Sequence, residues 1–363
     1  MNDDDLTFEE RQAAIATAQA AGASWAPVDL TSVLDGTYRP LLPSVGRRND
    51  GVGLFYPGRV HTVASESEAG KTWFALLACR DELADGRDVL YLDFEDDEVG
   101  VVNRLLAVGA PRAEIAAHFH YVRPEEPVTT GTGWARLLDV LGLPELTLCV
   151  TDGVTEAMSM HGLEMKDNTD VARFGKLLLR RIADLGPAVV ALDHVTKASE
   201  SRGRYAIGAV HKLNGVNGAA FVLENRKPFG VGQLGKSTLF IAKDRPGQLR
   251  RHALPSREGL HWFADLAIDS QTEMDATTDL WPPKPGEDES KRNVKLMLSV
   301  SDALARAGRP LTKGEVEERV TGKAVDIRSA LAALVDEEFV ELSSGAHGAK
   351  LHRLIKEFVD VGF

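Results

Sequence analysis

The sequence predicts an α/β fold in which a mainly parallel β-sheet is covered by helices and extended by antiparallel strands. Three observations predict this class. Short apolar runs alternate with segments of helical periodicity between residues 59 and 192. The first run leads into a Gly-Lys-Thr loop that is followed by a helical segment. Beyond about residue 215, apolar runs are separated by Gly and Pro turns instead, which is typical of antiparallel strands.

The expected strands are short apolar runs bounded by polar residues or glycine. They span residues 59–64, 88–94, 147–151 and 188–192 in the parallel part, and 219–224, 236–242 and 249–254 in the extension. Helices are expected where apolar residues recur at helical spacing, at residues 73–80, 99–108 and 169–185. A polar N-terminal leader contains one further candidate helix, the Ala-rich segment at residues 8–21.

A change in composition separates the main domain from a small C-terminal domain. The segment DATTDLWPPKPGEDE, residues 275–289, is rich in proline and acidic residues and is typical of an interdomain linker. We therefore expect four parts along the chain: a leader at residues 1–54, a nucleotide-binding domain at 55–270, a linker at 271–289 and a further domain at 290–363.

The C-terminal domain is expected to contain three helices followed by a β-hairpin. The helices span residues 294–307, 312–320 and 324–338, and the hairpin strands span 339–342 and 349–354. Thr312 and Glu315 form the capping-box pattern at the start of the second helix. This order of elements predicts a winged helix-turn-helix domain.

The net charge of −12 argues against a protein that coats nucleic acid without selectivity. Residues 290–363 are nearly neutral, so residues 1–289 carry almost all of this charge. No apolar run approaches the roughly 18 residues that span a bilayer, and the acidic N-terminus lacks the regions of a signal peptide. Cys79 and Cys149 fall in an expected helix and strand, which supports neither a disulfide framework nor a zinc site. We therefore expect a cytoplasmic protein without membrane contact.

The segment SESEAGKT matches the phosphate-binding pattern G-x-x-x-x-G-K-[ST], except that Ser65 replaces the first glycine. A strand–loop–helix unit directs backbone N–H groups and a helix N-terminus at a phosphate. Lys71 is therefore expected to reach the β/γ-phosphates of ATP, and Thr72 to ligate Mg²⁺. The alternative is an ordinary turn before a helix. The residues expected to contact the nucleotide are Ser65, Glu66, Ser67, Glu68, Ala69, Gly70, Lys71, Thr72 and Trp73.

Two carboxylates follow expected strands at the edge of the sheet where ligands bind. Asp152 ends an apolar strand, where a carboxylate can hold Mg²⁺ beside Thr72; the same position also suits a turn aspartate before Gly153. Glu95 ends the second strand and is the candidate base that polarises the attacking water. The alternatives are Asp96 in that role, or a solvated acidic helix cap.

Basic residues supply the remaining candidates. His194 follows a strand and is placed to bond the γ-phosphate, in competition with Asp193 and with a purely structural role. Lys243 and Arg245 end a later strand, where they form either a solvated turn or a finger that reaches a neighbouring subunit's nucleotide. A Gly-flanked loop holds a further basic set that is a candidate for facing a DNA channel, Arg202, Arg204, His211 and Lys212.

The order SESEAGKT, LDFED, LCVTDG, LDHVTK and IAKDRPG resembles that of RecA-like P-loop ATPases of the RepA/DnaB hexameric helicase group. The resemblance is strongest to the RepA-type, AAA_25-like proteins of phages, plasmids and actinobacterial mobile elements, and it covers about half of the chain. It implies a RecA-like core that forms a homo-oligomer, with a hexamer as the expected ring, and acts on single-stranded DNA.

The same resemblance implies a role for each site residue. Lys71 and Thr72 correspond to the Walker A pair, and Lys243 and Arg245 to a K-x-R finger pair. Ser65 and Gly153 depart from the family pattern, and both departures bear on the rate and affinity of the ATPase. The three other counterparts are the catalytic glutamate, the Walker B aspartate and the sensor histidine, at Glu95, Asp152 and His194.

In a winged helix-turn-helix domain the third helix enters the major groove and the wing contacts the DNA backbone. The predicted DNA contacts are therefore Lys323 and Arg328 on that helix and Lys350 and Arg353 on the wing, with His347 near them. The set is small and is interrupted by acidic residues, so phosphate contact is expected before sequence reading. A domain that mediates protein contacts is the alternative.

These observations predict a DNA-associated ATPase that uses ATP and Mg²⁺, acting as a RepA-like replicative helicase or a helicase loader. The alternative from a different class is a nucleotide-gated DNA-binding regulator with slow or no ATP turnover. A structural ATP-binding protein without turnover is a third reading, which the replacement at Ser65 keeps open.

Overall fold

The computed structural model of the protein describes residues 27–165, 167–194, 215–256, 259–284, 294–345 and 349–358. The chain divides into two compact units, Met1–Leu41 and Leu42–Phe363. In the described part of the first unit, α2 (Thr31–Leu34) is a single short turn of helix. The candidate helix at residues 8–21 lies outside the described residues.

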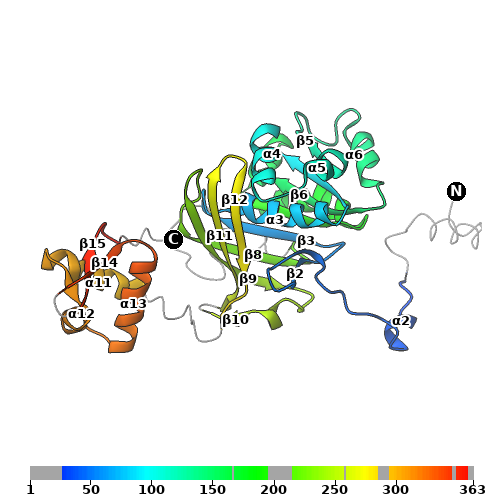
Figure 1. Cartoon of the computed structure of the whole chain (residues 1–363). Helices are drawn as coiled ribbons and strands as arrows, with labels where there is room; N and C mark the ends of the chain where they lie inside the picture. Colours follow the sequence, from blue (N-terminus) through cyan, green and yellow to red (C-terminus); the bar gives the residue numbers. More distant parts are fainter. Residues whose placement is uncertain are drawn as a thin grey trace, which may run out of the picture. The chain divides into compact units, whose positions relative to one another are not determined.

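Within the described part of the second unit, ten strands form one large sheet (Figure 1). Its parallel part has the spatial order β5-β4-β6-β7-β3-β8, so the strand that enters the phosphate loop is central. This mixed α/β architecture with a mostly parallel sheet fits a RecA-like P-loop core. The parallel strands are β3 (Val60–Ser65), β4 (Asp88–Asp93), β5 (Phe119–Val122), β6 (Leu146–Asp152), β7 (Ala188–His194) and β8 (Ala219–Lys227).

Antiparallel strands extend the sheet beyond β8, as the Gly and Pro turns predicted. β9 (Leu234–Asp244) pairs with β8, and β11 (His261–Thr272) pairs with β9. β11 also pairs with β10 (Leu254–Pro255) and with β12 (Asp275–Trp281). The sheet therefore ends in a long hairpin made by β11 and β12.

Helices cover both faces of the parallel part. Along β4, Leu90 and Leu92 pack into an apolar cluster with the helices that follow β5 and β6, whereas Tyr91 points to the opposite face because side chains alternate along a strand. That opposite face is covered by α3 (Lys71–Ala84), which contacts β4 and β6. The other helices are α4 (Glu98–Ala107), α5 (Arg112–His118), α6 (Gly133–Leu141), α7 (Val154–Met160), α8 (Asn168–Phe174), a π-helix (Gly175–Leu179) and α9 (Arg180–Ala183).

The core begins earlier than the predicted boundary at residue 55. β1 (Val45–Arg47) and β2 (Gly53–Phe55) form an antiparallel pair. The backbone N–H of Gly46 donates to Glu82 of α3 over 2.9 Å. Gly46 has φ +61°, and a Cβ there would lie 2.7 Å from the Ala78 Cβ, so the close approach to α3 requires glycine. Each of these strands has only three residues, which is too short for a periodic pattern in the sequence.

The predicted linker at residues 271–289 also begins too early. Residues 275–281 form β12, in which Leu280 is buried and pairs with Leu266 of β11. Asp275 and Asp279 lie on this edge strand, where polar side chains face water. The strand predicted at 249–254 is wrong as well: the structure has a short 3₁₀ helix, Arg250–His252, and then β10.

The C-terminal region contains the helices and the hairpin that the sequence predicted, with its own apolar core. β13, β14 and β15 pair antiparallel in the order β13-β15-β14. The side chains and backbones of Thr312 and Glu315 form the predicted capping box. No helix in the described ranges is long and apolar enough to cross a membrane. The elements are α11 (Val294–Ala307), β13 (Leu311–Thr312), α12 (Lys313–Arg319), α13 (Ala324–Asp336), β14 (Val340–Ser344) and β15 (Lys350–Leu354).

Candidate active site

The phosphate loop connects β3 to α3 in the predicted strand–loop–helix order. Gly70 caps α3 with φ +89°, and Lys71 and Thr72 are the first two helical residues. Ser65, where the pattern has glycine, is buried at the end of β3, and its hydroxyl donates to the Glu66 carbonyl over 2.7 Å. Ser65 has no positive φ, so a side chain is accommodated there without the strain that glycine usually relieves.

A chain of hydrogen bonds joins three of the predicted site residues. The Lys71 ammonium group lies 3.2 Å from His194 Nδ1, and His194 Nε2 lies 2.9 Å from a Glu95 carboxylate oxygen. The parallel register brings them together, because Ser65 of β3 pairs with His194 of β7. Burial lowers the pKa of Lys71, while the nearby carboxylates, led by Asp152, oppose this shift. The structure therefore gathers a cation, an imidazole and a carboxylate beside the phosphate loop.

Asp152 and Thr72 form a second pair at the start of α3. The Thr72 hydroxyl donates to Asp152 over 3.1 Å, and the buried Tyr91 hydroxyl donates to the same carboxylate oxygen over 2.6 Å. Burial raises the pKa of Asp152, and the negative charges of Glu95 and Asp93 add to the shift. A hydroxyl and a carboxylate are oxygen donors of the kind that Mg²⁺ uses beside substrate phosphates, so these residues fit a magnesium ion.

The three acidic residues after β4 have different partners. Asp97 caps α4 by accepting from the Gly100 N–H over 2.8 Å, and Asp96 forms an ion pair with Arg104 at 2.8 Å. Glu95 is the one of these three that bonds to His194. Of these three carboxylates, Glu95 is therefore the one that joins the hydrogen-bonded chain with His194 and Lys71.

Asp93 is a positioning residue that sequence reasoning missed. It is fully buried at the end of β4, and one of its carboxylate oxygens accepts the backbone N–H groups of Glu95 and Asp96, each over 2.9 Å. Its other oxygen accepts from Tyr121 over 2.9 Å. Asp93 thus fixes the turn that carries Glu95. The sequence feature that could have identified Asp93 is its position as an acidic residue within the apolar run of an expected strand.

Gly153, the second departure from the family pattern, has a steric reason. It has φ +79°, and a Cβ at this position would lie 3.2 Å from the Cβ atoms of both Glu95 and Phe94. Glycine therefore allows the segment after Asp152 to pass close to the segment that carries Glu95.

The β8–β9 hairpin supports the phosphate loop through contacts that the sequence did not indicate. The Ser237 hydroxyl donates to the Ala69 carbonyl over 2.8 Å, and the Asn225 amide donates to the Glu68 carbonyl over 3.1 Å. The Phe229 ring lies against Gly70, where a Cβ would meet it at 2.8 Å. The loop conformation therefore depends on the β8–β9 hairpin.

Lys243 and Arg245 lie at the end of β9 and in the turn after it. Lys243 pairs with Ala220 of β8, and the Arg245 backbone N–H donates to the Gly218 carbonyl over 3.0 Å. The Arg245 side chain is exposed. The predicted basic loop with Arg202, Arg204, His211 and Lys212 lies outside the described residues.

The predicted DNA contacts fall into two groups. Lys323, which precedes α13, and Lys350 of β15 are exposed. Arg328 and Arg353 are also exposed, but they form ion pairs at 2.7 Å with Glu317 and Glu341. The two lysines are therefore the more accessible cations. His347 lies outside the described residues.

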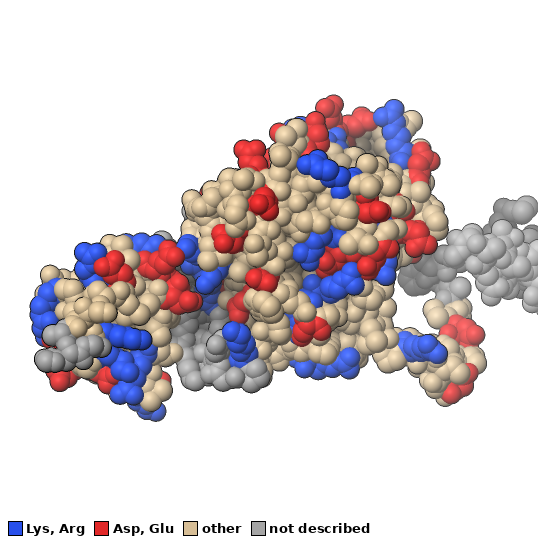
Figure 2. Space-filling view, viewed as in Figure 1, with Lys and Arg blue, Asp and Glu red and all other residues tan. Residues whose placement is uncertain are grey.

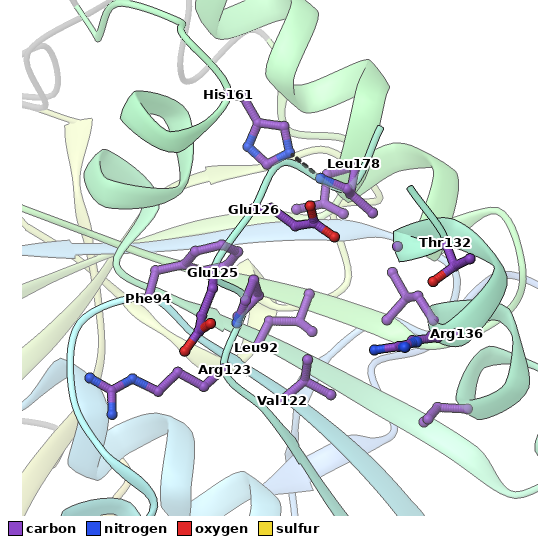
Figure 3. A pocket seen from close by; sticks show the side chains of 15 residues that line it. Leu92, Phe94, Val122, Arg123, Glu125, Glu126, Thr132, Arg136, His161 and Leu178 are labelled. Atoms are coloured by element: carbon purple, nitrogen blue, oxygen red, sulfur yellow. Dashed lines mark hydrogen bonds between the residues drawn. The ribbon is translucent and has the colours of Figure 1, made fainter. Parts of the chain in front are cut away.

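A separate cavity of about 530 Å³ lies beside the segment that carries Glu95 (Figure 3). Leu92, Phe94 and Val122 line it, and Arg136 from α6 points into it. His161 accepts from the Val128 N–H over 3.1 Å and so holds one wall. None of the predicted site residues lines this cavity.

Residues 30–200 match the AAA_25 family model, an AAA domain. The match includes the phosphate loop, Glu95, Asp152 and His194, and it supports a P-loop ATPase of the AAA/RecA-like kind that binds nucleotide with a divalent metal. The matched range ends before β8, so Lys243, Arg245 and the C-terminal region lie beyond it. No curated protein matches the chain.

Proposed function

We propose that this protein is a DNA-associated ATPase that hydrolyses ATP at interfaces between subunits, as a RepA-like replicative helicase or helicase loader. The observation that carries the proposal is the hydrogen-bonded chain Lys71–His194–Glu95 beside the Thr72–Asp152 pair. A phosphate-binding cation, a candidate base and a pair of oxygen ligands lie together where phosphoryl transfer needs them.

Each residue has a defined part in the proposed reaction. Lys71 and the loop N–H groups would bind the β/γ-phosphates, and Thr72 and Asp152 would hold Mg²⁺, which would offset the phosphate charge. Glu95 orients the water that attacks the γ-phosphate. When Lys71 turns to the phosphates, it leaves His194 Nδ1. This nitrogen is then available to form a hydrogen bond with the γ-phosphate. His194 thereby links occupancy of the phosphate site to the position of Glu95.

The proposed link to DNA rests on the C-terminal region. The order α11-β13-α12-α13-β14-β15 supports a winged helix, in which α13 would be the helix that approaches the major groove. Figure 2 shows Lys and Arg interspersed with Asp and Glu on the face in view, and the net charge is −12. DNA contact is therefore local, with Lys323 and Lys350 as the first candidates for the phosphates.

The test is ATP hydrolysis with and without single-stranded DNA, for the wild type, Lys71→Ala and Lys176→Ala. Lys176 is exposed on the π-helix and serves as the control for loss of a lysine. We expect DNA to stimulate the wild type and the control, and Lys71→Ala to lose activity by about 100-fold or more. If DNA does not stimulate hydrolysis, the proposed helicase function is contradicted. If Lys71→Ala keeps full activity, the assignment of Lys71 to the phosphate site is contradicted.

The second candidate function is a nucleotide-gated DNA-binding regulator with slow turnover. The observation that favours it is that His194 contacts both Lys71 and Glu95, so the protein itself holds both groups. Such a switch predicts that ATP changes DNA affinity although hydrolysis is negligible. A particle size that stays monomeric with ATP would favour the regulator, because the helicase proposal requires assembly.

A further inference from the structure

The turn after β9 is anchored by one buried carboxylate. Asp244 is 6% exposed, and its two oxygens accept the backbone N–H groups of Gly247, Leu249 and Arg250 over 2.9–3.1 Å. These bonds replace the strand predicted at residues 249–254, because N–H groups that bond to Asp244 are not available for a β-ladder. The conformation of the turn is therefore set by a side chain within it.

Tyr56 ties this turn to the centre of the sheet. Its hydroxyl donates to Asp244 over 2.8 Å and accepts the N–H groups of Gln248 and Leu249 over 3.0 and 3.1 Å. Burial and the adjacent carboxylate raise the pKa of Tyr56, so the hydroxyl remains a donor. The Tyr56 ring stacks on His61 of β3, and the Tyr56 N–H donates to His61 Nε2 over 2.9 Å. The turn is thereby joined to the strand that leads to the phosphate loop.

Arg245 projects from this fixed backbone into solvent. Its N–H is held by Gly218, while its guanidinium has no hydrogen bond or ion pair within the described ranges. A solvated turn needs no buried carboxylate or tyrosine to hold it, since water satisfies exposed N–H groups. A fixed backbone beneath an exposed arginine reduces the conformational entropy that the arginine loses when it binds an anion.

We propose that Asp244 and Tyr56 are positioning residues that direct Arg245 at the nucleotide phosphates of an adjacent copy of this chain. The inference rests on the proposed function, since it needs ATP to lie at an interface between subunits. It adds that the rate at each site depends on two buried groups of the neighbouring subunit that never touch the nucleotide. Asp244 and Tyr56 act through the backbone, and Arg245 stabilises charge on the transferred phosphoryl group.

The experiment combines single variants with mixed assemblies. Arg245→Ala should lower kcat by about 1000-fold. Tyr56→Phe and Asp244→Asn should lower it by about 10-fold to 100-fold with unchanged KM for ATP, because a displaced group costs transition-state stabilisation. Arg251→Ala removes a nearby exposed arginine and should match the wild type.

Mixing with Lys71→Ala separates positioning from damage to the fold. Lys71→Ala lacks a working phosphate loop but keeps its turn, so it should restore hydrolysis to Arg245→Ala, Asp244→Asn and Tyr56→Phe subunits, whose phosphate loops are intact. A mixture of Asp244→Asn with Arg245→Ala should show no rescue and hydrolyse no faster than Asp244→Asn alone, since neither variant supplies a correctly placed arginine.

The outcomes distinguish the inference from the proposed function. Full activity of Arg245→Ala would contradict hydrolysis at a subunit interface and with it the whole proposal. If Arg245→Ala is inactive and rescued by mixing, but Tyr56→Phe and Asp244→Asn are fully active alone, the positioning role is wrong. Failure of Lys71→Ala to rescue Tyr56→Phe would overturn it too, because the defect would then lie in that subunit's own site.

Discussion

At the residue scale, Glu95 shows how far sequence reasoning reaches into this site. Its place after an apolar strand predicted a carboxylate at the ligand edge, but three adjacent acids followed that strand. The structure separates them by partner, since Asp97 caps a helix, Asp96 pairs with Arg104 and Glu95 bonds to His194. The sequence could not do this, because His194 comes from a strand almost a hundred positions later.

This separation predicts different effects for two neighbouring substitutions. Glu95→Gln should lower kcat by about 100-fold or more while ATP still binds, because the amide keeps an acceptor for His194 but cannot take a proton from water. Asp96→Asn breaks a partly exposed ion pair and should leave kcat nearly unchanged. Steady-state hydrolysis and nucleotide-binding titrations measure both. An inactive Asp96→Asn with active Glu95→Gln would reverse the assignment.

Asp152 carries a stability cost that its proposed role explains. Burial raises its pKa, so folding favours the protonated form and the charged carboxylate destabilises the protein at neutral pH. Asp152→Asn should therefore raise the Tm of the metal-free protein at pH 7 by about 1–4 °C, and abolish Mg²⁺-dependent hydrolysis. The difference in Tm between the variant and the wild type should disappear as the pH falls through the raised pKa toward 3.8, since the Asp152 carboxyl is then protonated and as neutral as the amide. Calorimetry across this range tests the sign; a lower Tm at pH 7 would contradict it.

At the element scale, the sequence predicted the strands that carry a long apolar pattern, but it did not predict the short strands that dock on α3. Strands β4, β6 and β7 are apolar along most of their length, so burial on both faces marks them in the sequence. Each strand of the β1–β2 pair has only three residues, and the attachment of the pair depends on Glu82 and Asp81 of α3. Contacts of this kind leave no periodic signal.

The attachment of β1 to α3 gives a prediction with a matched control. Gly46→Ala should destabilise the protein by about 2–4 kcal/mol, because it combines positive φ with a Cβ 2.7 Å from the Ala78 Cβ. Gly51→Ala has a similar positive φ but no atom within 4 Å of the added Cβ, so it should cost only about 1–2 kcal/mol. Urea unfolding of both variants measures the difference. Equal losses would mean that β1 does not pack on α3 as described.

At the scale of the whole molecule, two regions with separate apolar cores follow one another along the chain. The C-terminal core draws on α11, α12, α13 and β14, and the large sheet is completed by β12 before residue 282. The sequence predicted both regions because each has its own periodicity. It placed the boundary between them too early, because an exposed edge strand and a linker share a polar composition.

Two truncations of the full chain test where the ATPase region ends. A chain that stops after residue 284 keeps β12 paired with β11, so it should unfold cooperatively and hydrolyse ATP at the basal rate of the full chain. A chain that stops after residue 270, close to the predicted linker, loses β12 and leaves Leu266 and Ile268 on a long unpaired edge. Such edges recruit other chains, so this form should aggregate. Light scattering and basal hydrolysis compare the two, and a well-behaved, active chain ending at 270 would show that β12 is dispensable.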